Sequence, residues 1–318
     1  LKRAQLLLYF ANRAPCLIGI EACGGAHHWA LQLMKLGHEV RLMPAEYVKA
    51  FNIRNKNDSA DAQAIWRAVQ QPSKAVAVKS ETQQAMLALH RLRQQLVKYR
   101  TMQMNGLRGL LAEYGEVVAK GRASLDKGMP AILARVSERL PAFLVDTLRE
   151  QWNGLVKIDE QVEAIERRIG GWVKSDAAVA ALVAIPGVGL LTASAAVATM
   201  GSAKAFRSGR EFAAWAGLVP RQRGRGGKVE LSGISKRGDT YLRTLLVHGA
   251  RAVVMRSKDS RPWVEEMRRR RPLNVVIVAM ANKIAHDLGR PRPRATVREE
   301  LCWREAGLTD HPTSITSC

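Results

Sequence analysis

The chain has 318 residues, of which 47% are apolar and 5% aromatic, so it is long enough for about two or three domains with buried cores. A formal net charge of +22 and a pI of about 10.5 indicate nucleic acid or an anionic membrane surface as partner. The four cysteines are scattered without a C-x-x-C pair, which argues against a disulfide framework or a structural zinc site and fits a reducing cytosol.

The start of the chain predicts an α/β fold. Residues 16–22 are a short apolar run typical of a buried strand, residues 26–36 form an amphipathic helical pattern, and residues 39–43 predict a second strand. A strand, a helix and a strand in such a short space predict a parallel pair. Glu21 ends the first strand, at the edge where α/β sheets place their chemistry, whereas His27 and His28 are expected to belong to a helix face rather than to act as ligands.

A polar stretch further on predicts a helix that begins at Asn57 or Asp58. Asp58 and Asp61 would share one face of this helix, where two like charges are unfavourable unless a cation lies between them. Together with Glu21, these aspartates are hard oxygen ligands of the kind that Mg²⁺ or Mn²⁺ prefers. The alternative is an ordinary capping Asp with a solvated neighbour.

Two long amphipathic segments follow, at residues 81–118 and 142–173, with apolar residues at three- and four-residue steps. A break rich in Gly, Pro and Lys at residues 121–130 separates them. The pattern predicts an antiparallel helical hairpin or coiled coil whose role is spacing or the formation of a homo-oligomer.

Residues 177–203 contain no charged side chain, and this uncharged stretch is long enough to suggest a transmembrane segment. A Pro-Gly-Val-Gly turn breaks the run, so two short helices at 178–185 and 192–200 explain it better, and no membrane association is expected. The arrangement has the form of a helix–hairpin–helix, and the backbone around Gly187 and Gly189 is predicted to bind phosphate.

The positive charge is concentrated in residues 204–271, which hold 18 Lys and Arg against 6 Asp and Glu. Glycines allow a backbone to approach phosphate closely, and flanking cations supply long-range attraction. The sequence therefore predicts a glycine-rich basic loop at 221–228, followed by a helix from about Thr240. The cations expected to hold a polyanion are Arg221, Arg223, Arg225, Lys228, Lys236, Arg237 and Arg243.

Five motifs, taken in order, resemble one protein family. They cover most of the chain, from about residue 1 to about residue 288. The family is the DEDD-type transposases of bacterial insertion sequences, the IS110 family, and the sequence is most similar to its IS1111 branch. The motifs are Ile-Gly-Ile-Glu-Ala at 18–22, Arg-Asn-Lys-Asn-Asp-Ser-Ala-Asp-Ala at 54–62, Ile-Pro-Gly-Val-Gly at 185–189, Gly-Leu-Val-Pro-Arg at 217–221 and Ile-Ser-Lys-Arg-Gly-Asp at 234–239.

The resemblance implies a division of the chain into an RNase H-like (Holliday-junction-resolvase-like) domain at 1–78, a coiled-coil insert at 79–175 and a C-terminal transposase domain at 176–290. A tail at 291–318 is expected to be disordered. The resemblance also implies DNA recombination guided by a structured RNA. A bacterial cytoplasmic protein associated with the nucleoid is expected.

Carried over to this sequence, the family's catalytic tetrad matches Glu21, Asp58 and Asp61. In such sites the carboxylates hold Mg²⁺ or Mn²⁺, which activates a nucleophile and stabilises charge on phosphate. The tetrad's first Asp lies on a strand that would precede Leu1, so an N-terminally truncated copy is expected.

The family's nucleophile is a serine in the C-terminal domain, which forms a covalent bond to DNA. An ungapped count puts Arg225 at that place, and arginine cannot act as a nucleophile at neutral pH. Ser232 and Ser235 are the nearby hydroxyl candidates, besides Thr240.

The leading interpretation is a transposase or site-specific recombinase that binds DNA and a guide RNA. The missing Asp and the arginine at the serine position lead us to expect DNA binding without strand cleavage. The alternatives are a non-catalytic nucleic-acid-binding protein and a metal-dependent junction nuclease that needs no serine.

Overall fold

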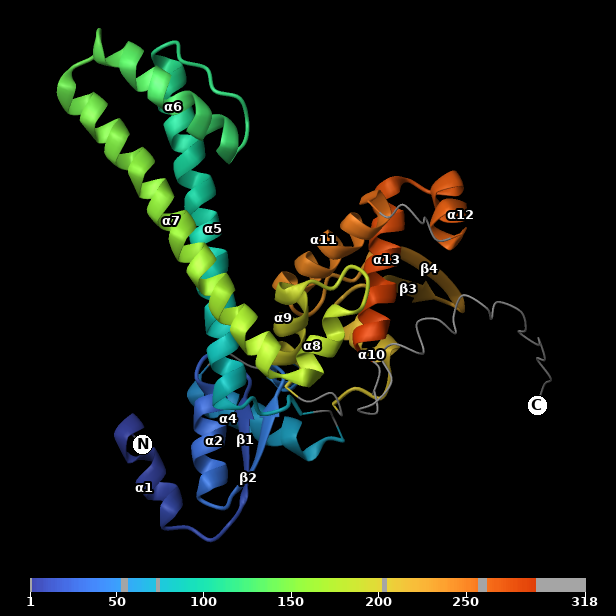
Figure 1. The fold of residues 1–318 in the computed structure, drawn as a ribbon. Helices are drawn as coiled ribbons and strands as arrows, with labels where there is room; N and C mark the ends of the chain where they lie inside the picture. Colours follow the sequence, from blue (N-terminus) through green and yellow to red (C-terminus); the bar gives the residue numbers. More distant parts are fainter. Residues whose placement is uncertain (1, 53–56, 73–74, 202–204, 257–261, 290–318) are drawn as a thin grey trace.

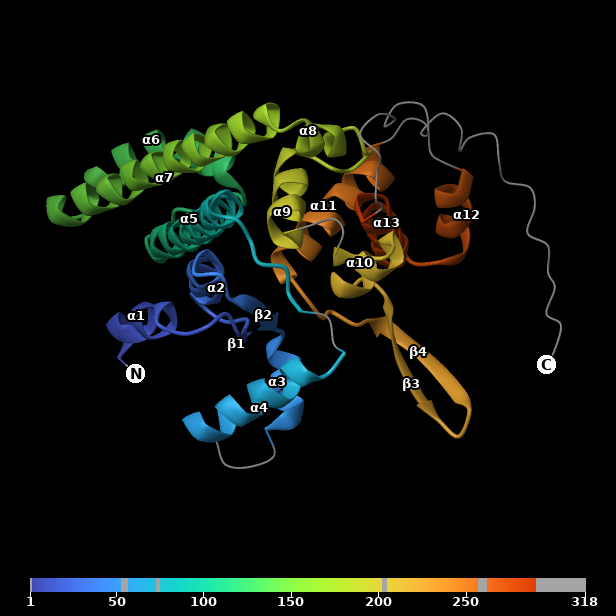
Figure 2. The same ribbon diagram turned by 90° about the horizontal axis from the view of Figure 1, so that it is seen from below.

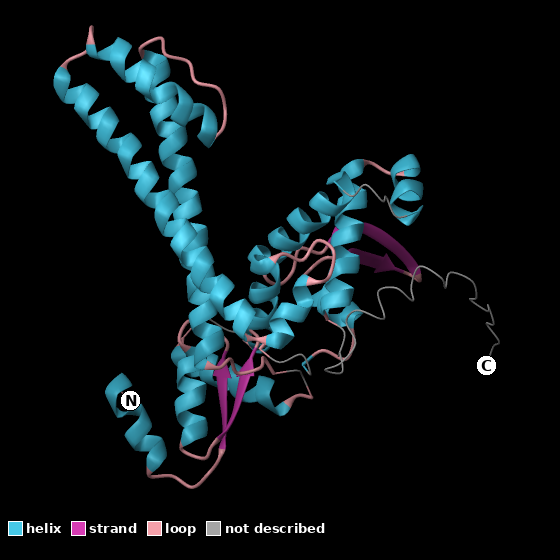
Figure 3. Cartoon of the chain, in the orientation of Figure 1, coloured by secondary structure: helices cyan, strands magenta, loops and turns pink. Residues whose placement is uncertain are grey.

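A computed structural model describes residues 2–52, 57–72, 75–201, 205–256 and 262–289. It has an N-terminal α/β unit, a long helical stalk that projects away from it, and a C-terminal helical body that carries a β-hairpin (Figure 1). The strands form two separate pairs, one in the N-terminal unit and one on the C-terminal body (Figure 3). The tail predicted at 291–318 lies outside the described residues.

The N-terminal unit contains the predicted parallel pair. Its two strands align from Leu17 opposite Glu39 to Glu21 opposite Met43, with the intervening helix as the crossover, so the strand–helix–strand prediction is confirmed. A short helix directly after the second strand was not predicted. The elements are η1 (Arg3–Gln5), α1 (Leu6–Ala11), β1 (Leu17–Glu21), α2 (Ala26–Lys35), β2 (Glu39–Met43), α3 (Ala45–Phe51) and α4 (Asp58–Gln70).

The stalk is built from α5 (Glu81–Glu113) and α7 (Ala142–Ser175), which run antiparallel along each other (Figure 1). Buried apolar residues of α7 recur at three- and four-residue steps or whole heptads, as the sequence predicted for the packed face. Ion pairs fasten the two helices: Arg93 lies 2.6 Å from Glu166, and Arg100 lies 2.7 Å from Asp159. The two predicted helices are confirmed, and their coiled-coil character stays a prediction.

The predicted break at residues 121–130 is wrong. The structure has a helix there, α6 (Arg122–Ser137), which packs at the tip of the stalk (Figure 1). Pro130 lies inside α6 but on its exposed side, while an apolar stripe on the other side is buried against α5 and α7. Burial of that stripe outweighs the helix-breaking tendency of Gly and Pro, which composition alone emphasised. The stripe consists of Leu125, Met129, Ile132, Leu133 and Val136.

The C-terminal body has the largest core of the molecule. This core also takes in residues from the base of the stalk, including Met86 of α5 and Ile169 of α7, so stalk and body share one packed interior. None of the helices in the described ranges combines the length and the apolar character that a membrane crossing requires. The helices of the body are α8 (Ala177–Val183), α9 (Leu190–Met200), α10 (Gly209–Trp215), α11 (Thr240–Arg256), α12 (Pro262–Arg270) and α13 (Leu273–Leu288).

The predicted basic loop at 221–228 is also wrong as a description of the backbone. It is most of an antiparallel β-hairpin of β3 (Pro220–Arg225) and β4 (Lys228–Ile234), which projects from the body (Figure 2). Gly226 and Gly227 form its two-residue turn with φ values of +58° and +78°. Two residues with positive φ are what the preferred hairpin turn requires, and glycine adopts them without strain.

A buried histidine ties the stalk to the body. His90 of α5 is 1% exposed, with Nδ1 3.0 Å from the Tyr241 hydroxyl and Nε2 3.0 Å from the Ser194 hydroxyl. Ser194 donates its proton to the Leu190 carbonyl oxygen, so His90 donates from Nε2 and accepts from Tyr241 at Nδ1. Burial, and next the nearby Arg93, lower the pKa of His90 to about 4.

We therefore expect the protein to lose stability in mild acid. His90 is protonated below about pH 6.5 in the unfolded chain but only below about pH 4 in the folded one, so the unfolded state binds more protons in between. The contribution of His90 to the free energy of unfolding should fall by up to ~3 kcal/mol as the pH drops through this window. Urea unfolding of His90→Gln, which keeps a donor and an acceptor, should show a flatter pH profile. The exposed control His248→Gln should match wild type, and a His90→Gln profile as steep as wild type would contradict the assignment.

Candidate functional site

The two predicted aspartates lie in the first turn of α4. Asn57 caps this helix by accepting a hydrogen bond from the Ala60 amide at 2.8 Å, so Asp58 begins the helix rather than capping it. Asp58 is exposed and Asp61 is half-buried. Negative side chains in the first turn are favoured by the positive end of the helix dipole, which offsets part of their mutual repulsion.

Glu21 ends β1 on the sheet face that α4 covers. Alternate residues of a strand point the same way, so Glu21 shares its face with Gly19. A Cβ at Gly19 would collide with Val69 and lie 3.1 Å from Ile65, so glycine at this position lets α4 press directly on the strand. Asp61 lies one helical turn before Ile65 on the same side of α4. The three predicted carboxylates therefore belong to two elements that pack against each other.

Asn52, which sequence reasoning did not select, lies beside Asp61. Its Nδ2 donates to Asp61 Oδ1 at 2.6 Å, while its own Oδ1 is buried without a hydrogen-bond partner among the described residues. An unpaired buried carbonyl oxygen is costly and calls for a donor or a cation. No spacing rule pointed to Asn52, because it is the C-cap residue of α3 and contacts Asp61 of α4, nine positions along the chain.

The oxygen donors near the start of α4 suit a divalent cation in their chemistry. Within the ranges that the structure describes, no three His, Cys, Asp or Glu side chains come together in a group that could hold a metal ion. The assignment of Glu21, Asp58 and Asp61 as metal ligands thus stays a prediction, with the orphaned Asn52 oxygen as the structural feature that fits it.

The predicted cations of the hairpin share one of its faces. Arg221, Arg223 and Arg225 are two residues apart along β3, with a shift of the pairing register between Pro220 and Gln222, and Lys228 stands directly opposite Arg225. Glu230, opposite Arg223, is the one acid on this face. All residues of β3 are exposed (Figure 2 shows the hairpin projecting away from the helices). On the opposite face, β4 presents two apolar side chains, Val229 and Leu231, which are 67% and 61% exposed.

At the base of the hairpin, the backbone of residues 215–217 packs directly against the backbone of residues 236–238. A Cβ at Gly217 would collide with the Arg237 carbonyl oxygen, and a Cβ at Gly238 with that of Trp215. Lys236 is the one non-glycine residue with positive φ, at 56°, among the described residues, and its amide donates to the Gly217 carbonyl oxygen at 3.1 Å. This segment fixes the angle at which the hairpin leaves the body.

Arg243 has a structural role at this backbone contact at the base of the hairpin. Its Nη1 donates to the carbonyl oxygens of Ala216, at 3.0 Å, and Arg237, at 2.8 Å. Its Nη2 donates to Thr240 Oγ1 at 3.1 Å. Arg237 and Lys236 are exposed, so their side chains can reach a ligand. Most N–H groups of Arg243, in contrast, donate to oxygen atoms of the protein itself. Its role as a phosphate contact stays a prediction.

The two serine candidates differ in access. The Ser235 hydroxyl oxygen is buried and has no hydrogen-bond partner among the described residues. Ser232 is exposed on β4, and its hydroxyl donates a long hydrogen bond of 3.4 Å to the Arg221 carbonyl oxygen. Of the two, only Ser232 is placed where a nucleic-acid strand could meet it. Arg225 lies at the end of β3, next to the hairpin turn.

The turn between α8 and α9 lies against the body. Gly187, with φ +86°, faces Ile284, Val253 and the backbone of Gly249, and a Cβ there would come within 2.7 Å of the first. The glycine is thus required for close packing. Gly189, which begins α9 as its N-cap, is exposed. The two predicted helices are present, and a phosphate contact at this turn stays a prediction.

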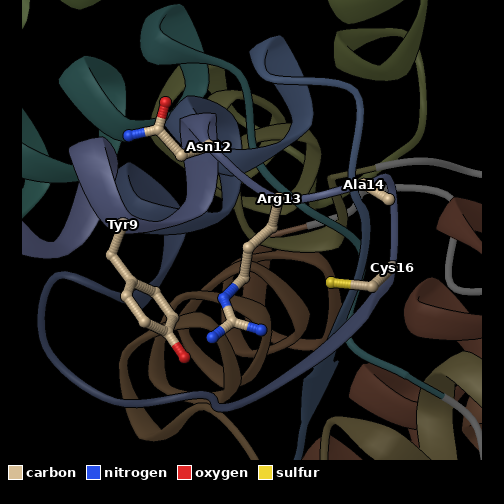
Figure 4. A pocket seen from close by; sticks show the side chains of 5 residues that line it. All are labelled: Tyr9, Asn12, Arg13, Ala14 and Cys16. Atoms are coloured by element: carbon tan, nitrogen blue, oxygen red, sulfur yellow. The ribbon is translucent and has the colours of Figure 1, made fainter.

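A pocket beside α1 contains none of the predicted site residues. Its lining includes Tyr9, Asn12, Arg13 and Cys16 (Figure 4). The guanidinium of Arg13 lies 4.2 Å from the centre of the Tyr9 ring, so the two side chains form a cation–π contact. This pocket adds nothing to the site described above.

Two family models match the chain. The model described as "Transposase IS116/IS110/IS902 family" matches residues 179–265, and the DEDD model of IS110, described as "Transposase", matches residues 2–116. The first covers most of α8, all of α9 and the hairpin, and the second covers the N-terminal unit and the whole of α5.

Curated relatives align over nearly the whole length. A "Probable family 20 transposase" of Pseudomonas aeruginosa is 45% identical over 96% of this chain and 90% of its own. The "Transposase for insertion sequence element IS1328" of Yersinia enterocolitica is 40% identical, covering 89% and 85%. The "Transposase for insertion sequence element IS1111A" of Coxiella burnetii is 38% identical, covering 89% and 79%.

Proposed function

Because the chain belongs to the IS110/IS116/IS902 family of insertion-sequence transposases, we propose that it binds DNA and a guide RNA through the basic face of the β3–β4 hairpin. The observation that carries this proposal is the exposed row of Arg221, Arg223, Arg225 and Lys228, with Glu230 as the one acid beside them. A two-stranded ribbon has a width that a nucleic-acid groove accepts, and its cations can neutralise phosphates on either side.

The second part of the proposal concerns Glu21, Asp58 and Asp61, which would hold a divalent metal ion beside the bound strand. When bound, Mg²⁺ or Mn²⁺ would stabilise negative charge on a phosphate and lower the pKa of a nucleophile that it coordinates. The α4 dipole supports the two aspartates, and Asn52 holds Asp61 by one hydrogen bond. Arg225, at the place of the family's serine, would bind phosphate instead of attacking it.

The metal site is tested by the response of stability to metal. Mn²⁺ at about 100 times its dissociation constant should raise the free energy of unfolding of the wild-type chain by ~2.7 kcal/mol. Asp61→Asn and Asp58→Asn should abolish this increase, because each removes an anionic ligand. Glu39→Gln, an exposed carboxylate of β2 that pairs with Arg41, is the matched control and should respond like wild type. Equal Mn²⁺ responses in all four proteins would overturn the metal assignment.

A nicking assay with the same variants separates the rival functions. We expect DNA binding without nicking, because Arg225 replaces the nucleophile and the Ser235 hydroxyl is buried. Nicking that requires Mn²⁺ and Asp61 but survives Ser232→Ala would favour a metal-dependent junction nuclease. Strand joining that is lost in Ser232→Ala would favour a full recombinase.

The proposed homo-oligomer would form through the stalk. Leu92, Tyr99 and Met102 of α5 are 51%, 43% and 63% exposed, and their spacing of seven and three residues places them on one side of the helix. Such a surface suits a second copy of the same chain. A place in the bacterial cytoplasm, at the nucleoid, follows from the proposed DNA partner.

A further inference from the structure

Three basic side chains lie near one another where the N-terminal unit, the stalk and the body join. His27 of α2 and Lys79, just before α5, are in contact: His27 Nε2 lies 3.1 Å from Lys79 Nζ, and His27 Nδ1 accepts the Lys79 amide at 3.2 Å. Arg91 of α5 is close enough to act on both electrostatically. We call His27, Lys79 and Arg91 the junction cluster.

The contact between His27 and Lys79 sets like groups against each other. Since Nδ1 accepts a backbone proton, a neutral imidazole carries its own proton on Nε2, which then points at an ammonium group. Burial first, then Lys79 and Arg91, lower the pKa of His27 to about 4. Burial and then Arg91 lower the pKa of Lys79, and Asp239 opposes this only as a smaller effect.

The cluster is not neutralised by the part of the protein that the structure describes. Among the described residues, no carboxylate lies within ion-pair distance of Lys79 or Arg91. Asp239 is near enough to favour the charged form of Lys79, as the smallest of the effects on its pKa, and its Oδ1 also accepts the Leu242 amide at 2.8 Å at the start of α11. Two cationic groups held close together without an ion-paired carboxylate repel each other, and a bound anion relieves that repulsion.

The position of the cluster indicates which anion. His27 follows Glu21 by a short turn, at the carboxyl edge of the parallel sheet, and Asp239 directly follows the base of the hairpin. The segment before Lys79 touches both sides: Val76 bridges Leu42 of β2, and Ala77 contacts Gly201 at the end of α9. Figure 2 shows this linker between the N-terminal unit and the body. The cluster thus adjoins both the sheet edge that carries Glu21 and, through Asp239, the start of α11 just beyond the hairpin.

We propose that the junction cluster of His27, Lys79 and Arg91 binds a phosphodiester group of the nucleic acid as it passes from the hairpin to the carboxylate edge. This inference rests on the proposed function for the identity of the anion, but the cluster and its unpaired charge do not depend on it. A bound phosphate would supply the missing counter-charge and favour the protonated forms of His27 and Lys79, so binding takes up protons and weakens as the pH rises.

The test follows the His27 ring by NMR in the full chain. Inorganic phosphate and a single-stranded oligonucleotide should each shift the ring resonances saturably and raise the pKa of His27 from about 4. The double variant Lys79→Met, Arg91→Gln should lose the response to both probes and bind the oligonucleotide about tenfold more weakly. The control Lys98→Met, an exposed lysine on α5, should behave as wild type.

The outcomes separate this inference from the proposed function. Hairpin variants should keep the phosphate response of His27 while losing oligonucleotide affinity. An unmoved His27 ring in wild type, or an unchanged response in the double variant, overturns the inference even where the hairpin binds. A response to inorganic phosphate with none to the oligonucleotide overturns the assignment to nucleic acid.

Discussion

Replacing Arg221, Arg223, Arg225 and Lys228 together by glutamine is expected to weaken duplex DNA binding on the order of 10³-fold near 0.1 M salt. Each cation that contacts a phosphate releases counterions, so removing four contacts should also reduce the slope of log K against log salt by about 3.6. Fluorescence anisotropy with a labelled duplex across a salt series measures both. Unlike a general charge effect, the loss should concern this one face of the hairpin.

The matched control removes the same charge from the stalk. Lys98, Lys120, Lys127 and Lys157 are exposed and lie far along the chain from the hairpin, so their replacement by glutamine leaves the net charge of the two variants equal. We expect the control to lose little affinity, because long-range attraction is screened beyond about 10 Å at this salt. Equal losses in both variants would show that net charge, and not the hairpin, accounts for binding.

Gly238→Ala is expected to have the largest effect on stability, a loss of at least ~3 kcal/mol in the free energy of unfolding. Gly238 has φ +74°, which costs energy for any residue with a Cβ, and the added methyl group would collide with the Trp215 carbonyl oxygen. The colliding atom is backbone, so it cannot move aside as a side chain would. Urea unfolding at pH 7 gives the measurement.

Gly109→Ala is the control for this change. Gly109 lies in α5 at an exposed position with no heavy atom within 4 Å of an added Cβ. Alanine there should stabilise the protein by up to ~1 kcal/mol, since it restricts the unfolded chain and favours helix. A Gly238→Ala protein as stable as wild type would mean that the backbone segments at the base of the hairpin can separate without a loss in the free energy of unfolding.

The regular elements could be predicted because each carries a local signal. The apolar runs of β1 and β2 and the helical period of α5 and α7 are properties of neighbouring residues. The hairpin was missed because its strands are rich in Arg and Gly, although Gly226-Gly227 between alternating residues was a usable signal. α6 was missed because its burial depends on α5 and α7, which composition does not show.

The candidate site could be predicted only in part. Asp58 and Asp61 follow from a capping pattern within one helix, and Glu21 from its place at a strand end. The Asn52 contact with Asp61 and the contact of His27 with Lys79 join different elements, the latter 52 positions apart. Such contacts are created by tertiary packing, so no spacing rule can reveal them.

The helix α5 connects the junction between the N-terminal unit and the body to the distant tip of the stalk. It extends without interruption for 33 residues, about 50 Å, from the junction cluster to the tip formed with α6. At its base, Gln83 holds the Gly201 carbonyl oxygen at 2.6 Å and His90 holds Tyr241, the second residue of α11. A packed interior transmits strain rather than absorbing it. The base of the stalk is thus tied by a direct side-chain contact to the start of α11, the helix that follows the hairpin.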